Sequence, residues 1–181
     1  MTIHVAMLTP TRIRWSTDGP KNRNRWKHTV FMGKSKYADF AALKPYTDLI
    51  RKGLGDLVDG DHFFDTIAEK ALFKFLYEFP GWPREIRGRA NLMAAYSGYG
   101  DNIKLRKADH LVVHKCEGNR IVILEYEVHG KILATGVPYD NRFVSILSIE
   151  QRKIVRWRDY MDSLAAMTAL SKMASDKANR S

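Results

Sequence analysis

Alternation of apolar and polar residues dominates the last third of the chain, and this pattern predicts β-strands with one buried face. The pattern is clear in residues 153–160, where Val155, Trp157 and Asp159 fall on one face. An acidic group therefore shares a face with two large apolar residues. The same reasoning predicts strands at 71–79, 111–116, 121–128, 131–137, 142–149 and 153–160.

Helical spacing replaces this alternation in the first half of the chain. Ile50, Leu54 and Leu57 recur at intervals of three and four residues, which places them on one side of a helix. Pro45 suits the first turn of that helix, and Gly60 can end it. Further helices are predicted for residues 62–70, from 88 onward and over 163–173. Helices followed by a mostly antiparallel sheet predict an α+β domain, with the helices packed on one side of a curved sheet.

The position of Asp159 among apolar residues has chemical consequences. A carboxylate in such surroundings must be hydrogen-bonded or paired with a cation, or else its pKa rises. A raised pKa suits a general acid or base that works near neutral pH. The alternative is structural, with Asp159 at a solvated strand end and both Asp159 and Asp162 capping the helix that follows.

Two further polar side chains lie in strands that are otherwise apolar. Tyr126 shares a face with Leu124 and Val128, and Asn141 shares a face with Phe143. A carboxylate, a phenol and an amide that line one apolar pocket can transfer a proton or activate water. Each also has a structural alternative, Tyr126 as a core aromatic with a satisfied hydroxyl and Asn141 as a turn residue.

Aromatic residues follow one face of the predicted strand 71–79. Phe73, Phe75 and Tyr77 occupy every second position there. Such a row is common in a hydrophobic core, and it can also form the wall of a cavity for an apolar ligand.

Charge is distributed unevenly over the 181 residues, whose net charge is +10. Residues 1–37 hold eight Lys and Arg against a single acid, Asp18, and show no lasting periodicity, so they are predicted to form a basic, irregular or partly ordered extension. The predicted domain spans residues 38–173, and residues 174–181 form a polar tail. A basic arm can touch nucleic acid, but the domain itself is nearly balanced in charge. We therefore expect a solvated arm and no nucleic-acid partner.

The chain lacks the motifs of several large functional classes. It contains no Gly-rich phosphate loop, no His-Glu-x-x-His and no Gly-x-Ser-x-Gly. His110 and His114 lie four residues apart in a strand pattern. The strand rise separates them by roughly 13 Å, too far to share one metal ion. We therefore expect no metal ion, and nothing in the sequence indicates an organic cofactor.

The expected compartment follows from three absences. No apolar run approaches the roughly 18 residues needed to cross a membrane. The first 30 residues lack the apolar core of a signal peptide. The single cysteine, Cys116, cannot form a disulfide within the chain and suits a reducing compartment. We expect a cytoplasmic protein with no membrane partner.

Three motifs, together with the predicted order of helices and strands, resemble a known superfamily. They are Glu-Phe-Pro-Gly-Trp-Pro followed by Arg-Gly-Arg in residues 78–89, Pro-Tyr-Asp-Asn-Arg-Phe-Val-Ser in 138–145, and Lys-Ile-Val-Arg-Trp-Arg-Asp-Tyr-Met-Asp in 153–162. They are similar to the SnoaL-like branch of the nuclear transport factor 2-like superfamily. The resemblance covers about residues 46–170.

The resemblance implies a cone-shaped α+β fold, in which a strongly bent antiparallel sheet wraps around helices and leaves a deep pocket. It also implies a small apolar or cyclic ligand and a homodimer formed through the sheet. Members of the superfamily include ketosteroid isomerase, limonene epoxide hydrolase, polyketide cyclases and phenazine-biosynthesis proteins, and many others have no known activity. Membership therefore implies the pocket and not the reaction.

Only part of the catalytic apparatus of these enzymes carries over. The Trp-Arg-Asp-Tyr stretch is similar to one in limonene epoxide hydrolase, where its aspartate belongs to an Asp-Arg-Asp set, and Asp159 matches that aspartate. Tyr126 and Val128 stand where the arginine and the second aspartate would be. Epoxide hydrolysis by that mechanism is therefore not expected. Polyketide cyclases and phenazine-biosynthesis proteins place an acid near the same position as Asp159.

These observations lead to one functional prediction and one alternative. The prediction is a small-molecule enzyme in which Asp159 is the general acid/base, while Tyr126 and Asn141 orient the substrate or stabilise an oxyanion. The reaction is a proton transfer, in an isomerisation, cyclisation or dehydration of a cyclic, mostly apolar compound. The alternative is a non-catalytic binding protein of the same fold, with Asp159 as a structural acid. The predicted pocket wall consists of Phe73, Phe75, Tyr77, Val128, Phe143 and Trp157.

Overall fold

The computed structural model describes residues 36–169, apart from 80, 117 and 119. The predicted basic extension 1–37 lies outside this part except for its last two residues, and the predicted tail 174–181 lies wholly outside it. In chain order the elements are the 3-10 helix η1 Ala38–Leu43, α1 Lys44–Leu54, η2 Gly55–Leu57, η3 Phe63–Thr66, β1 Ile67–Phe75, β2 Glu85–Arg87, α2 Arg89–Ser97, α3 Tyr99–Asn102, β3 Ile103–Cys116, β4 Ile121–Ile132, β5 Pro138–Glu150 and β6 Lys153–Met161, followed by helical residues 163–169.

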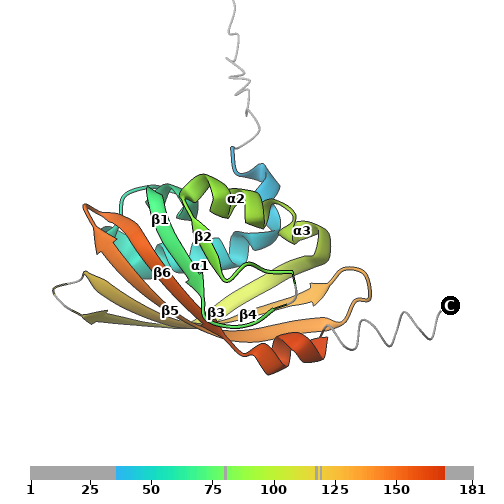
Figure 1. Cartoon of the computed structure of the whole chain (residues 1–181). Helices are drawn as coiled ribbons and strands as arrows, with labels where there is room; N and C mark the ends of the chain where they lie inside the picture. Colours follow the sequence, from blue (N-terminus) through green and yellow to red (C-terminus); the bar gives the residue numbers. More distant parts are fainter. Residues whose placement is uncertain (1–35, 80, 117, 119, 170–181) are drawn as a thin grey trace, which may run out of the picture. The chain divides into compact units, whose positions relative to one another are not determined.

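One six-stranded sheet organises the domain, in the order β2-β1-β6-β5-β4-β3. Figure 1 shows that the sheet is strongly curved, with α1 and α2 on one side of it. The predicted α+β class with a curved sheet around helices is thus confirmed. Neighbouring strands run antiparallel with one exception, because β1 and β6 pair in parallel.

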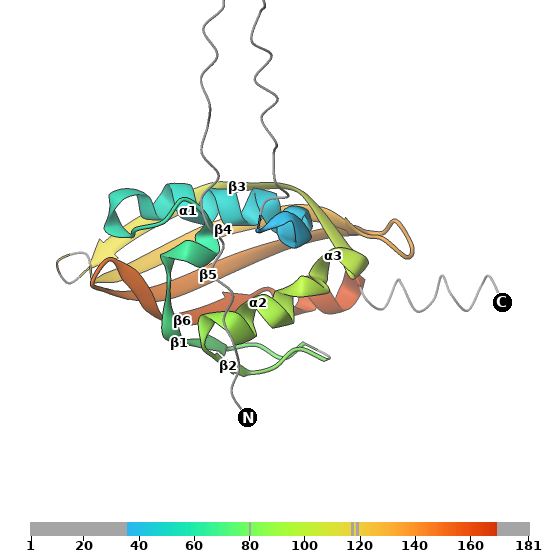
Figure 2. The same ribbon diagram turned by 90° about the horizontal axis from the view of Figure 1, so that it is seen from above.

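Helix α1 covers one face of the sheet because it has an apolar side. Helix α1 begins at Lys44 with a proline in its first turn and buries Tyr46, Ile50 and Leu54. Viewed from above, α1 lies along β3 and β4, while α2 lies toward β1 and β6 (Figure 2). In the described part of the chain, no helix is both long enough and apolar enough to cross a membrane.

Two of the predicted elements are wrong. Residues 62–70 form a helix only over η3, and the chain is already a strand from Ile67, because β1 pairs there with β6. This pairing overrides a local helical pattern. Residues 131–137 are no separate strand either, since β4 continues to Ile132. A hairpin turn follows, in which Gly136 adopts a φ of 74° and donates its N–H to the Ile132 carbonyl.

The residues on the helix-facing side of the sheet form the main core. Along β4 the alternation is regular, with Val122, Leu124, Tyr126 and Val128 all buried. Strand β6 contributes Trp157, which is 2% exposed. Its ring stacks on Phe73 and meets Phe63 edge-on. These ring contacts pack β1, β6 and η3 together.

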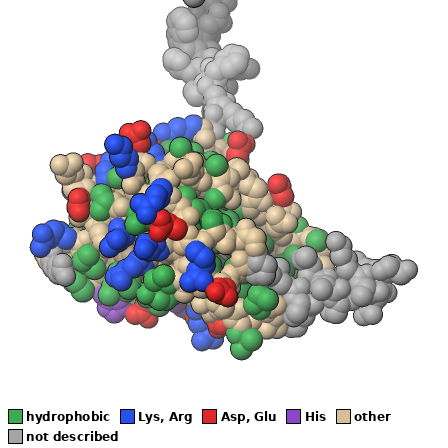
Figure 3. All heavy atoms as spheres, in the orientation of Figure 1, with side chains coloured by type: hydrophobic (Ala, Val, Ile, Leu, Met, Phe, Trp, Pro, Cys, Tyr) green, Lys and Arg blue, Asp and Glu red, His purple; other side chains and the backbone are tan. Residues whose placement is uncertain are grey.

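The edge formed by β1 and β2 carries charged side chains of both signs. Lys74 and Arg87 pair with Glu85, and Arg84 pairs with Glu78. Lys and Arg side chains are interspersed with acidic ones over much of the face in Figure 3. Such exposed pairs contribute little to stability, but charged side chains on an edge strand discourage it from pairing with another chain.

Gly130 is expected to be intolerant of any side chain. A Cβ atom at this position would lie 2.5 Å from the Lys104 carbonyl oxygen and 3.1 Å from the Leu105 Cα, both of them backbone atoms of β3. We expect Gly130→Ala to lower the free energy of unfolding by about 1–3 kcal/mol or more, measured by urea denaturation. Gly98→Ala is the control, because its Cβ would meet only an Asp101 oxygen at 3.8 Å. Equal stability of the two variants would contradict the proposed clash.

Candidate functional site

A cavity of about 720 Å³ lies between the helices and the curved sheet. This size suits a small organic ligand. Its wall is mostly apolar and aromatic, and Asp159 is the one acidic residue among the described residues that line it. The lining comprises Leu43, Tyr46, Tyr77, Phe79, Gly81, Trp82, Ala95, Tyr96, Gly98, Tyr99, Asn102, Ile103, Leu105, Tyr126, Val128, Ile132, Ala134, Tyr139, Phe143, Asp159 and Met161.

Asp159 reaches the cavity from β6, between β1 and β5. It is 4% exposed. Its Oδ1 accepts a hydrogen bond from the Ser145 hydroxyl at 2.5 Å and another from the Trp157 indole N–H at 3.1 Å. Among the described residues no hydrogen bond reaches Oδ2.

Burial has a direct effect on the acidity of Asp159. Desolvation disfavours the charged carboxylate and raises the pKa of Asp159 from 3.8 to about 6, while the hydrogen bonds from Ser145 and Trp157 act in the opposite direction. An acid with this pKa exists in both protonation states near neutral pH. It can therefore both accept and return a proton.

Tyr126 is connected to Asp159 through Ser145. The Tyr126 and Ser145 hydroxyl oxygens lie 3.1 Å apart. Ser145 donates its proton to Asp159, so the Tyr126 hydroxyl is the donor in this second hydrogen bond. The Tyr126 ring stacks on Phe143 with an interplanar angle of 3°. These contacts hold Ser145, and through it the carboxylate, in a single orientation.

Further tyrosines surround the same carboxylate. Burial raises the pKa values of Tyr77, Tyr96 and Tyr139, and the negative charge of Asp159 raises them further. Their hydroxyls therefore stay protonated and can donate hydrogen bonds inside the cavity. Of these three, only Tyr77 was predicted as a site residue. Tyr96 comes from α2, where nothing in the local sequence indicates a role.

Asn141 lies apart from the Asp159 carboxylate. Its Oδ1 accepts the backbone N–H groups of Arg142 at 2.7 Å and Asp162 at 3.1 Å. Its Nδ2 approaches the Tyr139 hydroxyl and the Met161 sulfur at 3.5 and 3.6 Å. Asn141 is buried and does not appear among the described residues of the cavity wall. The Asn141 amide thus links the start of β5 to the end of β6. Its two weaker contacts, Tyr139 and Met161, do line the cavity.

The predicted aromatic wall is divided between the cavity and the core. Tyr77, Val128 and Phe143 line the cavity. The other three, Phe73, Phe75 and Trp157, are buried at 2% exposure in the core, and in the described part of the chain they do not line the cavity. Phe75 nevertheless supports the wall, since its ring contacts Tyr77 and Trp82 edge-on.

Ser145 is another site residue that the sequence analysis did not single out. It is fully buried and lies directly opposite Asp159 across the β5–β6 pair. Alternation along β5 places it on the same face as Asn141 and Phe143. The strand register decides which of these three faces Asp159, and alternation within one strand does not specify register.

The raised pKa of Asp159 predicts a pH-dependent stability. At low pH both the folded and the unfolded chain hold this proton. As pH rises from about 4 to 6 the unfolded chain releases the proton first, so the folded state loses relative stability, in total about 3 kcal/mol. The Asp159→Asn variant lacks this titration. We therefore expect the wild type to lose stability relative to the variant as pH rises over this range. Urea denaturation of both proteins at each pH measures the two unfolding free energies. A pH-independent difference would contradict the raised pKa.

Ser145→Ala tests the hydrogen bond to Oδ1. Loss of this donor removes a contact that favours the charged carboxylate, so the pKa of Asp159 is expected to rise further. Carboxyl-detected NMR titration measures it directly. Ser148→Ala, on the same strand but paired with Arg156, is the matched control and should leave the pKa unchanged.

Comparison with known proteins agrees with this architecture. Residues 57–157 match the SnoaL-like domain family. The chain is 31% identical over 124 residues to the uncharacterized protein YesE of Bacillus subtilis, covering 67% of this chain and 84% of that protein.

Solved structures give the same result. A proposed isomerase from Bacillus subtilis has a TM-score of 0.58 at 25% identity, covering 74% of this chain and 94% of its own. A phenazine biosynthesis-related protein from Pseudomonas aeruginosa has a TM-score of 0.54 at 21% identity, covering 72% and 87%. An NTF2-like protein from Burkholderia xenovorans has a TM-score of 0.52 at 19% identity, covering 76% and 98%. The predicted relationship is confirmed: this chain belongs to the SnoaL-like domain family, and it has the fold of the NTF2-like protein.

Proposed function

We propose that this protein is a small-molecule enzyme of the isomerase or cyclase type, in which Asp159 transfers a proton on a cyclic, mostly apolar compound. The observation that carries the proposal is the buried Asp159 carboxylate at the cavity wall, hydrogen-bonded through Oδ1 and with Oδ2 left for a substrate. Family membership and the similarity to a proposed isomerase support the same class of reaction.

The proposed step is removal of a proton from a carbon next to a carbonyl group. Asp159 Oδ2 takes the proton, and the electron pair of the C–H bond moves toward the carbonyl oxygen to give an enolate. Where the ketone carries a β,γ double bond, return of the proton to the γ-carbon completes an isomerisation. Attack of the enolate carbon on a second carbonyl of the same molecule closes a ring and turns that carbonyl oxygen into an alkoxide, which takes the proton back from Asp159. A base with a pKa of about 6 suits both directions of the proton transfer.

The tyrosines of the cavity wall would stabilise the negative charge that develops on the carbonyl oxygen. Tyr77, Tyr96 and Tyr139 line the cavity and remain protonated, so each offers a donor to an oxyanion. Tyr126 has a different part in this proposal, as a positioning residue that holds Ser145 against Asp159. Asn141 does not contact the substrate in this proposal. It is a positioning residue that holds Tyr139 and Met161 in the cavity wall.

The character of the lining restricts the substrate class. Leu105, Val128 and Phe143 give broad apolar surface, which favours a fused or substituted ring over a sugar or a nucleotide. Among the described lining residues there is no Lys or Arg to hold a phosphate or a carboxylate. We therefore propose an uncharged cyclic ketone or diketone as the substrate class.

The experiment is proton exchange on cyclic ketones in D₂O. Indanone, tetralone and decalone are incubated with the full-length protein, and replacement of their α-protons by deuterium is followed by NMR. We expect exchange faster than in buffer, with a rate that rises with pH through about 6 as Asp159 ionises. Tight binding of these ketones without exchange would instead favour the alternative of a non-catalytic ligand-binding protein.

A further inference from the structure

A second group of polar side chains lies on the face of the sheet away from the cavity. Tyr126 and Val128 point into the cavity, so Glu127 and His129, which alternate with them on β4, point to the opposite face. Register brings partners beside them from both neighbouring strands. Asp109 of β3 lies opposite Glu127, and Asp140 of β5 lies opposite His129.

A β-bulge adds a second histidine to this face. Asp109 pairs with Glu127 and Val112 pairs with Glu125, so two residues of β3, His110 and Leu111, lie opposite a single residue of β4. Strict alternation would turn His110 away from Asp109. The positive φ of His110, 51°, instead directs its ring toward Asp109 and Glu127. A residue with a side chain is uncommon in this backbone conformation.

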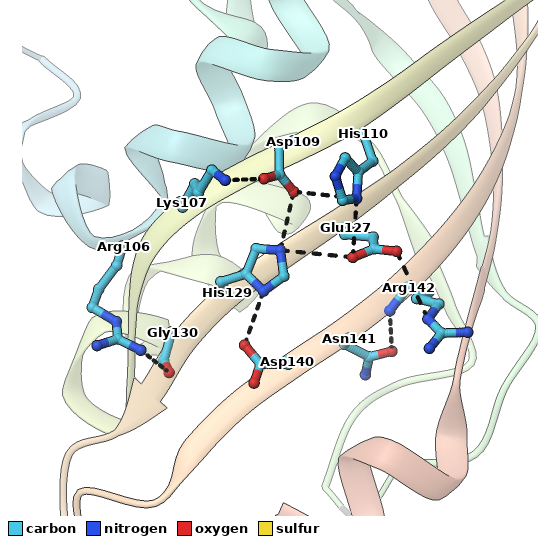
Figure 4. A network of polar contacts seen from close by, with 10 residues as sticks. All are labelled: Arg106, Lys107, Asp109, His110, Glu127, His129, Gly130, Asp140, Asn141 and Arg142. Carbon is cyan, nitrogen blue, oxygen red and sulfur yellow. Dashed lines mark hydrogen bonds and ion pairs between the residues drawn. The ribbon is translucent and has the colours of Figure 1, made fainter.

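Four ligand atoms make up what we call the His–acid cluster: Asp109 Oδ1, His110 Nδ1, Glu127 Oε2 and His129 Nε2 (Figure 4). Ligand atoms of Asp109, His110 and Glu127 all lie within 4.8 Å of one another, and His129 Nε2 contacts the two carboxylates. His129 lies 3.0 Å from Asp109 and 3.7 Å from Glu127. His110 lies 3.3 Å from Glu127 and 3.9 Å from Asp109. Ligands bound to zinc at about 2.0–2.1 Å lie roughly 3.3–3.4 Å apart in a tetrahedron. Of the six ligand–ligand distances in a tetrahedron, these are the four between an imidazole and a carboxylate, and they lie on both sides of that value.

In three of these side chains, those of Asp109, Glu127 and His129, the other polar atom also has a partner. Lys107 pairs with Asp109 Oδ2, and Arg142 lies 3.8 Å from Glu127 Oε1. Each carboxylate thus pairs one oxygen with a cation and turns the other into the cluster. Asp140 Oδ1 lies 2.9 Å from His129 Nδ1. With Nδ1 protonated toward Asp140, the lone pair of His129 is on Nε2, which is how a carboxylate orients a metal-binding histidine.

We propose that the His–acid cluster binds a zinc ion through Asp109, His110, Glu127 and His129, with Asp140 orienting His129. Two imidazole nitrogens and two carboxylate oxygens favour zinc over calcium or magnesium, which prefer oxygen ligands alone. Bound there, the ion would join β3 to β4 at a bulge, where the ladder of backbone hydrogen bonds is interrupted. The cluster faces away from the cavity, so this proposal is independent of the proposed proton-transfer chemistry.

The cluster is open to ions from solution. The His110 side chain is 71% exposed. In Figure 3 histidine side chains reach the surface beside acidic ones at the lower edge of the domain. Sequence spacing alone does not predict this site. Its ligands come from two strands, and the orientation of His110 depends on the bulge in β3.

The test uses the full chain without a tag, freed of metal with a chelator and titrated with Zn²⁺ by calorimetry. Cobalt(II) serves as a second probe, since its visible absorption reports the number and geometry of ligands. We expect one ion per chain. His129→Gln and Glu127→Gln should weaken binding by more than the roughly 10–100-fold expected for Asp140→Asn, an outer partner. His110→Asn removes a ligand but suits a positive φ, so it should weaken binding without disturbing the bulge.

His114→Gln is the matched control. His114 makes a cross-strand pair with Glu125 at 2.7 Å on the same β3–β4 ladder, but it lies outside the cluster. Its substitution should leave zinc affinity and the cobalt spectrum unchanged. Absence of zinc binding tighter than millimolar, or equal affinity in His129→Gln and His114→Gln, would overturn the proposal. Because Asp140 and His110 are largely exposed, their variants remain informative if a change at Glu127 impairs folding.

Discussion

Asp159→Asn is expected to slow deuterium exchange of a responsive cyclic ketone by about 10²–10⁴-fold, the usual contribution of a positioned general base. Asparagine matches aspartate in size and can still accept hydrogen bonds from Ser145 and Trp157, but it cannot take up the proton. Ligand affinity should change far less than the exchange rate, because the apolar wall is intact. NMR measures both quantities on the same sample.

Asp162→Asn is the matched control for this prediction. Asp162 is exposed just after the end of β6, and its side chain accepts the Ala165 N–H at the start of the last helical segment. Asparagine is an equally good cap, so exchange and stability should stay near wild type. Equal exchange rates for Asp159→Asn and wild type would show that Asp159 is not the base. They would favour the alternative of a non-catalytic ligand-binding protein.

Trp157→Ala is expected to lower the free energy of unfolding by about 3–5 kcal/mol, the usual cost of truncating a buried aromatic side chain. Trp157 is 2% exposed, stacks on Phe73 and meets Phe63 edge-on, so its removal leaves a cavity between β1, β6 and η3. Typical domains have only about 5–15 kcal/mol of stability in total. Urea denaturation followed by circular dichroism gives the change.

Trp157→Phe separates packing from hydrogen bonding. The smaller ring keeps much of the apolar contact but lacks the indole N–H that donates to Asp159. Stability should fall less than in the alanine variant, while the pKa of Asp159 should rise because one donor is gone. A loss of stability as large as that of Trp157→Ala would mean that the hydrogen bond, not the packing, dominates.

The sequence predicts the starts of the regularly alternating strands well and the limits of the other strands poorly. Of β3, which runs Ile103–Cys116, it predicts only residues 111–116. Strands β4 and β6 begin at Ile121 and Lys153 as predicted, because their alternation is regular. Strand β2 spans only three residues, too few for any period to be seen. Strand β1 runs Ile67–Phe75 and not 71–79, since its limits come from pairing with β6 and β2. Local pattern indicates that a strand exists, and its partners decide where it begins and ends.

In the candidate site too, the sequence predicts what depends on a single strand and misses what depends on contacts between segments. Asp159 stands out in the sequence because alternation within one strand places an acid beside Trp157. Ser145 depends on the β5–β6 register, and Tyr46 and Tyr96 depend on how α1 and α2 pack over the sheet. The position of Asn141, with its amide bound to the backbone of Arg142 and Asp162, also depends on the geometry of the strand ends. The periodicity of one segment carries no information about which distant segments it will contact.

The parallel pairing of β1 with β6 has a consequence for how the chain folds. Phe75 lies beside Asp159, although the two residues are 84 positions apart in the sequence. Closing so large a loop is entropically costly and slow, so this pair is expected to form late. On a ribosome β6 is also the last strand to emerge. The cavity therefore gains its acid only in the final step of folding, and ligand binding during refolding would report completion of the native topology.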